Sequence, residues 1–514
     1  MDHDVVVAGA GPVGLMLACE LRLGGAEVLV LERDEHTPAS RHGSMGARAV
    51  NQPTVHTLRL RGLLPAVEQA AAMWIGAMPE LPPGERPEIY AGHFAGIDIR
   101  ADRLKPGGEF LGAGVVSQAD LEAVLAERAA ELGVEVRRGV ALTGFDADAD
   151  GVTVHTGRGT VRAAWLVGAD GGRSTVRGLA GFDFPGVDPV FTGRQAVVDL
   201  ADPEKLVAGG WQHGENGSYV LGGWADGDGP VRVHTVEHDR PPADRDAPVT
   251  VEEVQASLRR VSGTDVTVTH VHVATRYADT TRQATTYRRG RVLLCGDAAH
   301  VHSPAGGQGM NLGIGDAVNL GWKLALVARG LAPDSLLDTY TAERHPIGAW
   351  VQKWSMAQTA LSTARGPRAD ALREVMTDLL DTPDGATYVV SMIGGAWQHY
   401  DLPGDHPLIG RRVPDLPLDD GTTLTACFRD GRAVLLDVDS GAAAIAAPWG
   451  DRVRVVTARP VAFPDQPMAA LVRPDGYVAW VAFGEAGGLD AALTAWLGPP
   501  ADVVALRDRM TRNP

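Results

Sequence analysis

Two glycine-rich segments contain the residues best suited to bind an anionic ligand. The first, Gly9-Ala-Gly11-Pro-Val-Gly14, has the spacing GxGxxG, and the second spans residues 296–311 with the sequence GDAAHVHSPAGGQGMN. Glycine lets backbone N–H groups approach a ligand closely. A helix N-terminus that follows such a turn adds a field that favours negative charge. Both segments therefore predict backbone pockets for an anionic or electron-rich ligand.

The residues around the first segment predict a complete βαβ unit. Residues 4–7 (DVVV) predict a buried strand, residues 12–23 a helix ended by Gly24-Gly25, and residues 27–31 (EVLVL) a second strand. Glu32 follows that strand, 18 residues after the last glycine of the motif. In such units the glycines approach a pyrophosphate and the terminal acid holds a ribose hydroxyl pair. We therefore predict a dinucleotide site; the alternative is a tight turn that binds no ligand.

Two further strands are predicted to end beside a glycine turn. Residues 291–295 (RVLLC) predict a short buried strand before the second segment, which turns at 303–307 and becomes helical from Asn311. Residues 164–168 (AWLVG) predict a strand that runs into Asp170-Gly171. An Asp-Gly pair after a strand is also a common structural turn. The sequence thus predicts a pocket wall at the second segment and leaves both readings open at Asp170.

The composition excludes several classes of partner. The net charge of −17 and the sequence pI near 5.4 leave no basic field for nucleic acid. Cys19, Cys295 and Cys427 form no CxxC, which argues against a disulfide framework or zinc site and fits a reducing compartment. Residues 1–4 (MDHD) are acidic where a signal peptide is basic, and the apolar run 5–19 is too short to span a bilayer. We expect a cytoplasmic monomer or homodimer without metal, nucleic-acid or membrane partners.

The chain predicts three domains. The nucleotide-binding domain would comprise residues 1–181 and 277–400, interrupted at 182–276 by an antiparallel-sheet domain for substrate. Residues 401–514 predict a small α/β domain closed by a C-terminal helix. Aromatic side chains of the inserted sheet could line a flat pocket, although such residues are as often part of a core. The candidate substrate residues are Trp211, Tyr219 and Trp224.

Three motifs in order carry a resemblance to a known family. They are GAGPVG (9–14), ADGGRS (169–174) and GDAAHVHSPAGGQGMN (296–311). Together they resemble the FAD-dependent aromatic hydroxylases of the p-hydroxybenzoate hydroxylase class, nearest to those that act on aromatic polyketides. The resemblance covers the whole chain. It implies an α/β fold, in which a Rossmann-type FAD-binding domain carries an inserted antiparallel sheet and a thioredoxin-like C-terminal domain follows.

The resemblance also implies which residues hold FAD. The first glycine segment would cradle the pyrophosphate, Glu32 would take the adenosine ribose, and Asp297 with the turn to Asn311 would lie along the ribityl chain and the isoalloxazine. Asp170 belongs to a motif that contacts both FAD and the nicotinamide cofactor in the family. The complete expected set is Gly9, Gly11, Pro12, Val13, Gly14, Glu32, Arg33, Arg41, Arg48, Gln118, Leu142, Asp170, Gly171, Gly296, Asp297, Pro304, Gly307, Gly309, Met310 and Asn311.

The reaction implied by the resemblance is the hydroxylation of a polycyclic aromatic polyketide intermediate in antibiotic biosynthesis. NADPH or NADH reduces FAD, O₂ adds at C4a, and the flavin C4a-hydroperoxide delivers oxygen to an activated phenol ring. The nicotinamide cofactor would bind transiently, because no second GxGxxG is present. No acid–base residue is assigned; His300, His302 and Arg276 are the candidates. Baeyer–Villiger oxygen insertion and a non-redox flavoprotein cyclase remain the alternatives.

Overall fold

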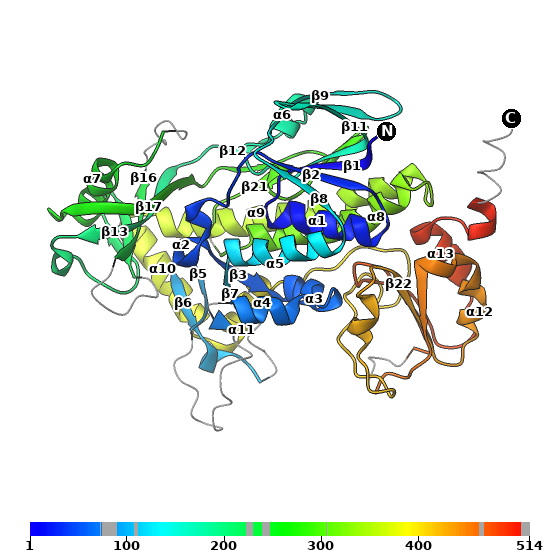
Figure 1. Ribbon diagram of the computed structural model, residues 1–514. Coiled ribbons are helices and arrows are strands. Elements are labelled where there is room, and N and C mark those ends of the chain that lie inside the picture. The colour runs from blue at the N-terminus through cyan, green and yellow to red at the C-terminus, as the bar shows by residue number, and fades with distance from the viewer. Residues whose placement is uncertain are drawn as a thin grey trace.

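The computed structural model describes residues 1–71, 73–74, 90–106, 112–222, 230–238, 247–304, 306–461 and 467–504. Figure 1 shows a large central part between an antiparallel sheet on one side and a mixed α/β part on the other. The N-terminus lies at the sheet of the central part.

An eight-stranded sheet forms the core of the central part, in the order β19-β20-β11-β1-β2-β8, with β10 paired to β11 and β9 to β10. The five strands β20, β11, β1, β2 and β8 pair in parallel with one another, whereas β19 pairs with β20 antiparallel. Because parallel strands end at the same edge of a sheet, the segments after β1, β11 and β20 meet there. The strand bounds are β1 His3–Ala8, β2 Val28–Glu32, β8 Glu135–Arg138, β9 Leu142–Ala147, β10 Val152–Thr156, β11 Gly159–Gly168, β19 Arg288–Arg289 and β20 Val292–Leu294.

Helices cover one face of this sheet. The strand register puts the apolar residues Val6 and Leu29 on one face and Val167 and Leu293 on the other, and all four are fully buried. α1 packs against both α5 and α8, while α6 contacts β9, β11 and β20. Burial on both faces accounts for the runs of valine and leucine in the strands. The helix bounds are α1 Pro12–Leu23, α5 Gln118–Glu131, α6 Thr175–Ala180, α8 Gly309–Ala328 and α9 Asp338–Thr363.

Two predicted helix boundaries were wrong. α8 begins at Gly309, two residues before the expected start at Asn311, and α9 runs through Pro346, which we expected to begin a helix. A proline inside a helix costs about 3 kcal/mol. Burial of Tyr340, Ile347 and Val351 on both sides of it stabilises the continuous helix.

Smaller elements complete the central part. The sheet β3-β7-β4 lies between α3 and α5, and β12-β18-β21 lies beside α9. The bounds are η1 Ala39–Arg41, α2 Gly43–Gly46, β3 Ala47–Asn51, α3 Gln52–Leu60, α4 Leu64–Ala70, β4 Met73–Trp74, β5 Tyr90–Phe94, β6 Ile97–Arg100, β7 Gly112–Ser117, β12 Gly186–Val187, β18 Thr281–Gln283, η5 Gly296–Ala298, β21 His300–Val301, α10 Pro367–Leu380 and α11 Pro383–Gly394.

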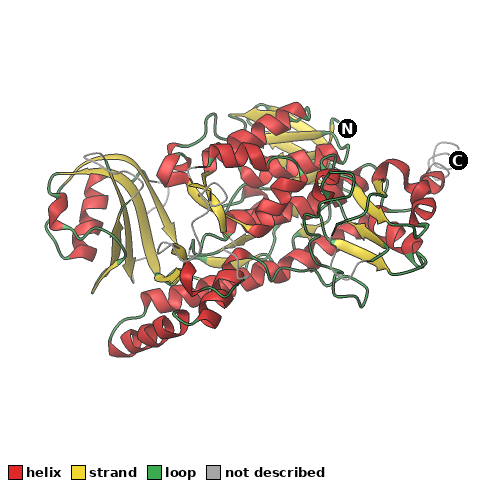
Figure 2. Ribbon diagram, turned by 90° about the horizontal axis from the view of Figure 1, so that it is seen from below, coloured by secondary structure: helices red, strands yellow, loops and turns green. Residues whose placement is uncertain are grey.

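The inserted sheet is antiparallel throughout, as predicted, in the order β14-β15-β16-β13-β17. α7 packs on one face with Val254 and Leu258 (Figure 2). The strands β13 and β17 contact α2 and η1 of the central part. The sheet therefore has one face closed by its own helix and an edge against the central part. The bounds are β13 Phe191–Leu200, β14 Gln212–Gly214, β15 Gly217–Leu221, β16 Val231–His238, α7 Val251–Ser262 and β17 Val268–Ala278.

The C-terminal part contains a mixed sheet, β23-β22-β24-β25, in which only β22 and β23 are parallel. A buried ion pair and a buried hydrogen bond attach it to the central part. Arg473 donates to both carboxylate oxygens of Glu343 at 2.9 and 2.8 Å, and Arg61 donates to the Phe428 carbonyl at 2.8 Å. The bounds are β22 Ala433–Asp437, α12 Ala442–Ala446, β23 Val453–Val456, β24 Ala469–Val472, β25 Val478–Ala482 and α13 Leu489–Leu497.

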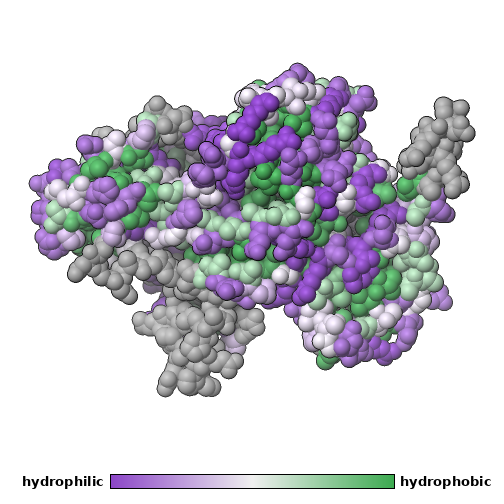
Figure 3. Space-filling model, viewed as in Figure 1, coloured by the Kyte–Doolittle hydropathy of each residue, from purple (hydrophilic) through white to green (hydrophobic). Residues whose placement is uncertain are grey.

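Hydrophilic and hydrophobic residues are interspersed over all three parts on the face shown in Figure 3. Within the described residues, none of the helices combines the length and the apolar character that crossing a membrane requires.

Candidate cofactor-binding site

The first glycine segment forms the turn between β1 and α1, and its three glycines differ in what surrounds them. A Cβ on Gly9, where φ is +107°, would lie 2.3 Å from the Ala169 carbonyl oxygen, and one on Gly14 would lie 1.9 Å from the Gly9 carbonyl oxygen. A Cβ on Gly11 would meet only the Glu122 Oε1 atom, at 4.0 Å. Gly9 and Gly14 are therefore required by the protein itself, whereas Gly11 borders open space that a ligand can fill.

Glu32 joins this turn to the end of β2. Its Oε2 accepts a hydrogen bond from the Ala10 N–H at 2.8 Å, and its Oε1 accepts one from the Asp34 N–H at 2.9 Å. A carboxylate has about four acceptor positions, so the side chain retains capacity for a ribose. Arg33 beside it is exposed. Leu142 lies two residues after Val140, whose N–H donates to the Glu32 carbonyl, so it follows at the same edge of the sheet.

Arg41 and Gln118 converge on a carboxylate that the sequence reasoning missed. Glu122 Oε1 accepts from Arg41 Nη1 and from Gln118 Nε2, both at 3.0 Å. Glu122 is buried, and its Oε2 has no hydrogen-bond partner among the described residues. Ser117 caps α5 by accepting from the Asp120 N–H, which fixes the helix start. The only available signal for Glu122 was its i+4 spacing from Gln118.

The two predicted site residues Arg48 and Asp297 carry opposite charges and lie on different elements. Arg48 lies on β3 and donates to the Ala47 carbonyl at 2.9 Å. Burial lowers the pKa of Arg48, while the charge of Asp297 raises it. Asp297 follows β20 and is exposed, although Gly296 and Ala298 beside it are buried. The site thus carries a cation and an anion whose charges act on each other.

The turn before α8 is held in place by Asn311. Its Nδ2 donates to the Ala49 carbonyl at 2.8 Å and to the Gly307 carbonyl at 3.1 Å, and its Oδ1 accepts from the Asn51 N–H at 3.0 Å. The side chain therefore fixes the loop and leaves ligand contact to the backbone. Helix geometry leaves the N–H groups of Gly309, Met310 and Asn311 without partners inside α8. Pro304 is exposed and accepts at its carbonyl from the Gly307 N–H.

Asp170 lies beside the first glycine turn. Ala169 donates its N–H to the Ala8 carbonyl at 2.8 Å, and Asp170 Oδ2 accepts from the Val176 N–H at 3.1 Å. Asp170 Oδ1 is buried without a hydrogen-bond partner among the described residues. Gly171 has a φ of +79° and open space around it. One Asp170 oxygen therefore accepts from the first turn of α6, as a structural turn would, and the contact of this motif with FAD stays a prediction.

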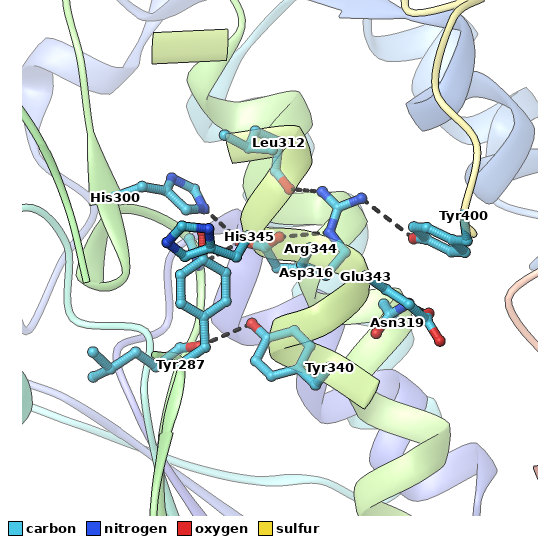
Figure 4. Close-up of polar contacts among 12 residues, drawn as sticks. Tyr287, His300, Leu312, Asp316, Asn319, Tyr340, Glu343, Arg344, His345 and Tyr400 are labelled. Carbon is cyan, nitrogen blue, oxygen red and sulfur yellow. Dashed lines mark hydrogen bonds and ion pairs between the residues drawn. The ribbon is translucent and has the colours of Figure 1, made fainter. Parts of the chain in front are cut away.

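A buried network behind the second glycine segment was not predicted (Figure 4). Asp316 Oδ2 lies 2.7 Å from His300 Nε2 and accepts from the Gly296 N–H at 3.1 Å. Arg344 Nε donates to Asp316 Oδ1 at 2.7 Å, and Arg344 Nη2 donates to the Leu312 carbonyl at 2.9 Å. Burial acts to raise the pKa of Asp316, but the interactions with His300 and Arg344 outweigh it and lower the pKa. Through Asp316 on α8, the network holds the backbone of the Gly296 turn in place.

The three acid–base candidates differ in whether their polar atoms already have partners within the protein. His300 pairs with Asp316, and Arg276 pairs with Glu253, so both have structural partners. His302 donates from Nδ1 to the Ser303 carbonyl at 2.7 Å. Its Nε2 is buried without a hydrogen-bond partner among the described residues, 3.5 Å from where a Cβ on Gly309 would lie.

The two candidate substrate residues that the structure describes, Tyr219 and Trp211, have different surroundings. Tyr219 is 6% exposed, packs on the α7 side of the inserted sheet and accepts at its hydroxyl from the Val207 N–H at 3.2 Å. It therefore belongs to a core and not to the surface that we expected. Trp211 is half-buried, with its ring 4.9 Å from that of His234. Trp224 lies outside the described residues.

The cradle fits FAD. It offers open space at Gly11 for a pyrophosphate, free backbone N–H groups at the start of α8, and buried oxygens of Asp170 and Glu122 without protein partners. These groups lie at the strand edge where β1, β11 and β20 end. FAD combines a pyrophosphate, two polyol groups and a polar ring, which such donors and acceptors can bind.

Comparison with known proteins agrees with this geometry. Residues 2–355 match the model of an FAD binding domain, and residues 406–500 match that of an aromatic-ring hydroxylase C-terminal domain. A 12-dehydrotetracycline 5-monooxygenase/anhydrotetracycline 6-monooxygenase from Streptomyces rimosus is 44% identical over 98% of this chain and 100% of the relative. A dialkyldecalin synthase from Streptomyces rugosporus is 39% identical over 98% of this chain and 100% of the relative.

A solved structure extends the likeness to three dimensions. An anhydrotetracycline hydroxylase from Streptomyces rimosus superposes with a TM-score of 0.84 at 42% identity, covering 98% of this chain and 100% of that chain. Because the FAD-domain match alone spans more than half of the sequence, this chain belongs to the FAD-dependent aromatic-ring hydroxylases and is a flavoprotein monooxygenase.

Proposed function

We propose that this monooxygenase hydroxylates a polycyclic aromatic polyketide in antibiotic biosynthesis, with NADPH or NADH as reductant. The observation that carries the proposal is the open cradle at Gly11 in a chain that is 44% identical, end to end, to a monooxygenase of anhydrotetracycline. The balanced reaction converts the phenol, O₂, NAD(P)H and one proton into the hydroxylated phenol, water and NAD(P)⁺. One oxygen atom enters the product and the other leaves as water.

The chain's residues divide the work of binding and orientation. Bound FAD supplies the activation of oxygen, which no side chain can perform. Gly11, Arg41 and Gln118 would hold its pyrophosphate side, and Glu32 its ribose. The N–H groups from Gly309 to Asn311 would favour negative charge at the opposite end of the cofactor.

The proposal extends to domains and setting. Residues 1–181 and 277–400 would form the FAD-binding domain, 182–276 the substrate domain, and 401–514 a thioredoxin-like domain. The mixed order β23-β22-β24-β25 supports the last assignment. The cysteines are far apart in sequence, so that domain would have a structural role rather than thiol chemistry. The acidic composition supports a cytoplasmic enzyme that acts as a monomer or homodimer.

The test uses the FAD-loaded enzyme with anhydrotetracycline and related tetracyclic phenols. We expect substrate to accelerate NAD(P)H oxidation and the product mass to increase by one oxygen atom. Product NMR would then show a new hydroxyl group and an intact carbon ring, which distinguishes hydroxylation from Baeyer–Villiger ring expansion. Failure of every polycyclic phenol to accelerate NAD(P)H oxidation would contradict the proposal.

A second candidate function has its own support. The dialkyldecalin synthase relative is 39% identical over 98% of this chain, and its name describes ring formation instead of oxygen insertion. In a cyclase of this kind FAD would shape the pocket without being consumed as an oxidant. The expected signature is a product isomeric with its substrate, formed without NAD(P)H and O₂.

A further inference from the structure

One face of the inserted sheet is turned away from α7. Side chains alternate across a strand, so Tyr219, Val233 and Thr235 face α7, whereas Arg232 and His234 face the opposite way. The strands β13 and β17 of this sheet contact α2 and η1, the segment of the central part that includes Arg41. The β13–β17 end of this sheet therefore adjoins the predicted cofactor site, and Arg232 lies on the neighbouring strand β16.

Arg232 is a half-buried cation without a carboxylate partner among the described residues. Its neighbour on β13 is Gln195. With the amide oxygen turned toward the guanidinium, Gln195 accepts from Arg232 Nε at 2.9 Å and from Arg232 Nη2. A neutral amide orients the guanidinium without cancelling its charge. Partial burial of such a cation costs desolvation energy, and a bound anion would offset it.

The charge of Arg232 acts on the cofactor side of the molecule. Burial lowers the pKa of Arg232, the cation Arg48 lowers it further, and Tyr277 acts in the opposite direction. The charge of Asp297 acts in turn on Arg48. Arg232 therefore lies near enough to Arg48, and Arg48 near enough to Asp297, for their charges to act on each other.

The surroundings of Arg232 form a rigid aromatic wall. Tyr277 hydrogen-bonds to His234 Nε2, and the His234 ring lies 4.9 Å from Trp211 and 5.2 Å from Tyr277. A Cβ on Gly193 would lie 2.1 Å from the Tyr277 ring, so this glycine is needed for the ring to lie flat on the sheet. Burial, and then Arg232, lower the pKa of His234 to about 3. His234 is therefore neutral at neutral pH, and Arg232 is the cation of this face.

We propose that Arg232, oriented by Gln195, binds the ionised oxygen of a phenol or enol on the substrate and so selects polycyclic substrates that carry one beside the aromatic wall. The inference rests on the proposed function, because it places the substrate between this face and the cofactor. A planar guanidinium matches an anionic oxygen and stacks beside aromatic rings. Binding moves the substrate proton to solvent and leaves a phenolate, which reacts with an electrophilic oxygen more readily than the neutral phenol.

The experiment measures the absorption spectrum of anhydrotetracycline bound to the FAD-loaded enzyme over a pH titration. In the natural enzyme we expect the phenolate spectrum to appear at a pH at least about one unit below that of the free molecule. Arg232→Met should abolish that shift, and Arg232→Lys should retain part of it. Gln195→Glu places a carboxylate opposite Arg232 and should also abolish the shift, with the guanidinium still present. Arg158→Met, in the exposed turn between β10 and β11, is the matched control.

Three outcomes overturn the inference. An unchanged phenolate shift in both Arg232→Met and Gln195→Glu would show that the ionised oxygen is bound elsewhere. Slower NAD(P)H-dependent reduction of FAD without substrate, together with a retained shift, would assign Arg232 to the reductant's phosphate. Loss of FAD from folded Arg232→Met would assign it to the cofactor. If the natural enzyme itself binds no polycyclic phenol, the proposed function fails together with the inference, which separates that result from the other three.

Discussion

The amide of Asn311 accepts a hydrogen bond from the Asn51 N–H at 3.0 Å, although 260 residues separate the two in sequence. Asn51 in turn caps α3, by accepting at its side chain from the Thr54 N–H at 3.2 Å. One amide therefore connects the turn before α8 to the start of α3, through β3. The loop that would face the cofactor is fixed from within the protein before any ligand binds.

Asn311→Asp should destabilise the protein through this contact. The substitution replaces the Nδ2 donor with an oxygen that faces the carbonyls of Ala49 and Gly307. Leaving buried acceptors unpaired costs about 1–3 kcal/mol, and more for a charged group. Urea unfolding of the apoprotein should show a loss of at least that size. Asn216→Asp is the control, because Asn216 is exposed and should change little; equal stability of the two variants would contradict the role given to Asn311.

Asp297→Ala should weaken FAD binding without weakening the fold. Asp297 is exposed between buried neighbours, so its removal leaves no cavity in the core. It removes the carboxylate acceptor that the ribityl hydroxyl groups of FAD would use. We expect the FAD dissociation constant to rise about 10- to 100-fold, or roughly 1.4–3 kcal/mol, in fluorescence titrations. The apoprotein should melt at the natural temperature, as should the exposed control Asp265→Ala; unchanged FAD affinity would remove Asp297 from the site.

The buried Lys323 should make the free energy of unfolding depend on pH. Burial lowers its pKa from 10.5 to about 8, with Glu343 opposing the shift. Between these values the unfolded chain binds more protons than the folded one, so the contribution of Lys323 to stability increases as pH rises from 8 to 10.5. The stability difference between the natural protein and Lys323→Met should therefore change by about 3 kcal/mol across that interval. Urea unfolding at several pH values measures it; a constant difference, like that expected for exposed Lys353→Met, would contradict the prediction.

Local chemistry made much of the fold predictable. The valines of residues 4–7, the GxGxxG turn and Glu32 define β1, α1 and β2 through contacts close in sequence, and the structure shows all three. Ser117 likewise predicts the start of α5, because capping acts within one turn. The helix start predicted at Pro346 was wrong because contacts distant in sequence decide it. Its local preference to begin a helix was overcome by distant packing along α9.

The site residues that escaped prediction depend on contacts between distant segments. Glu122 and Asp316 look like ordinary helical acids, and only the fold places them against Arg41 and against His300 with Arg344. The inserted sheet shows a related limit. The alternation of side chains identifies two faces of β15 and β16. Only the packing of α7 decides which of them is buried in the core: Tyr219 lies on the face against α7, and His234 lies on the opposite face.

The most direct test of the cofactor site compares Gly11→Ala with Gly14→Ala. A Cβ on Gly11 enters space free of protein atoms to 4.0 Å, and its φ of −73° suits alanine. A Cβ on Gly14 would lie 1.9 Å from the Gly9 carbonyl oxygen. We predict that apo Gly11→Ala melts within about 2 °C of the natural apoprotein but binds FAD at least about 100-fold more weakly, and that Gly14→Ala loses stability even without FAD. Stoichiometric, undiminished FAD binding by Gly11→Ala would contradict the account.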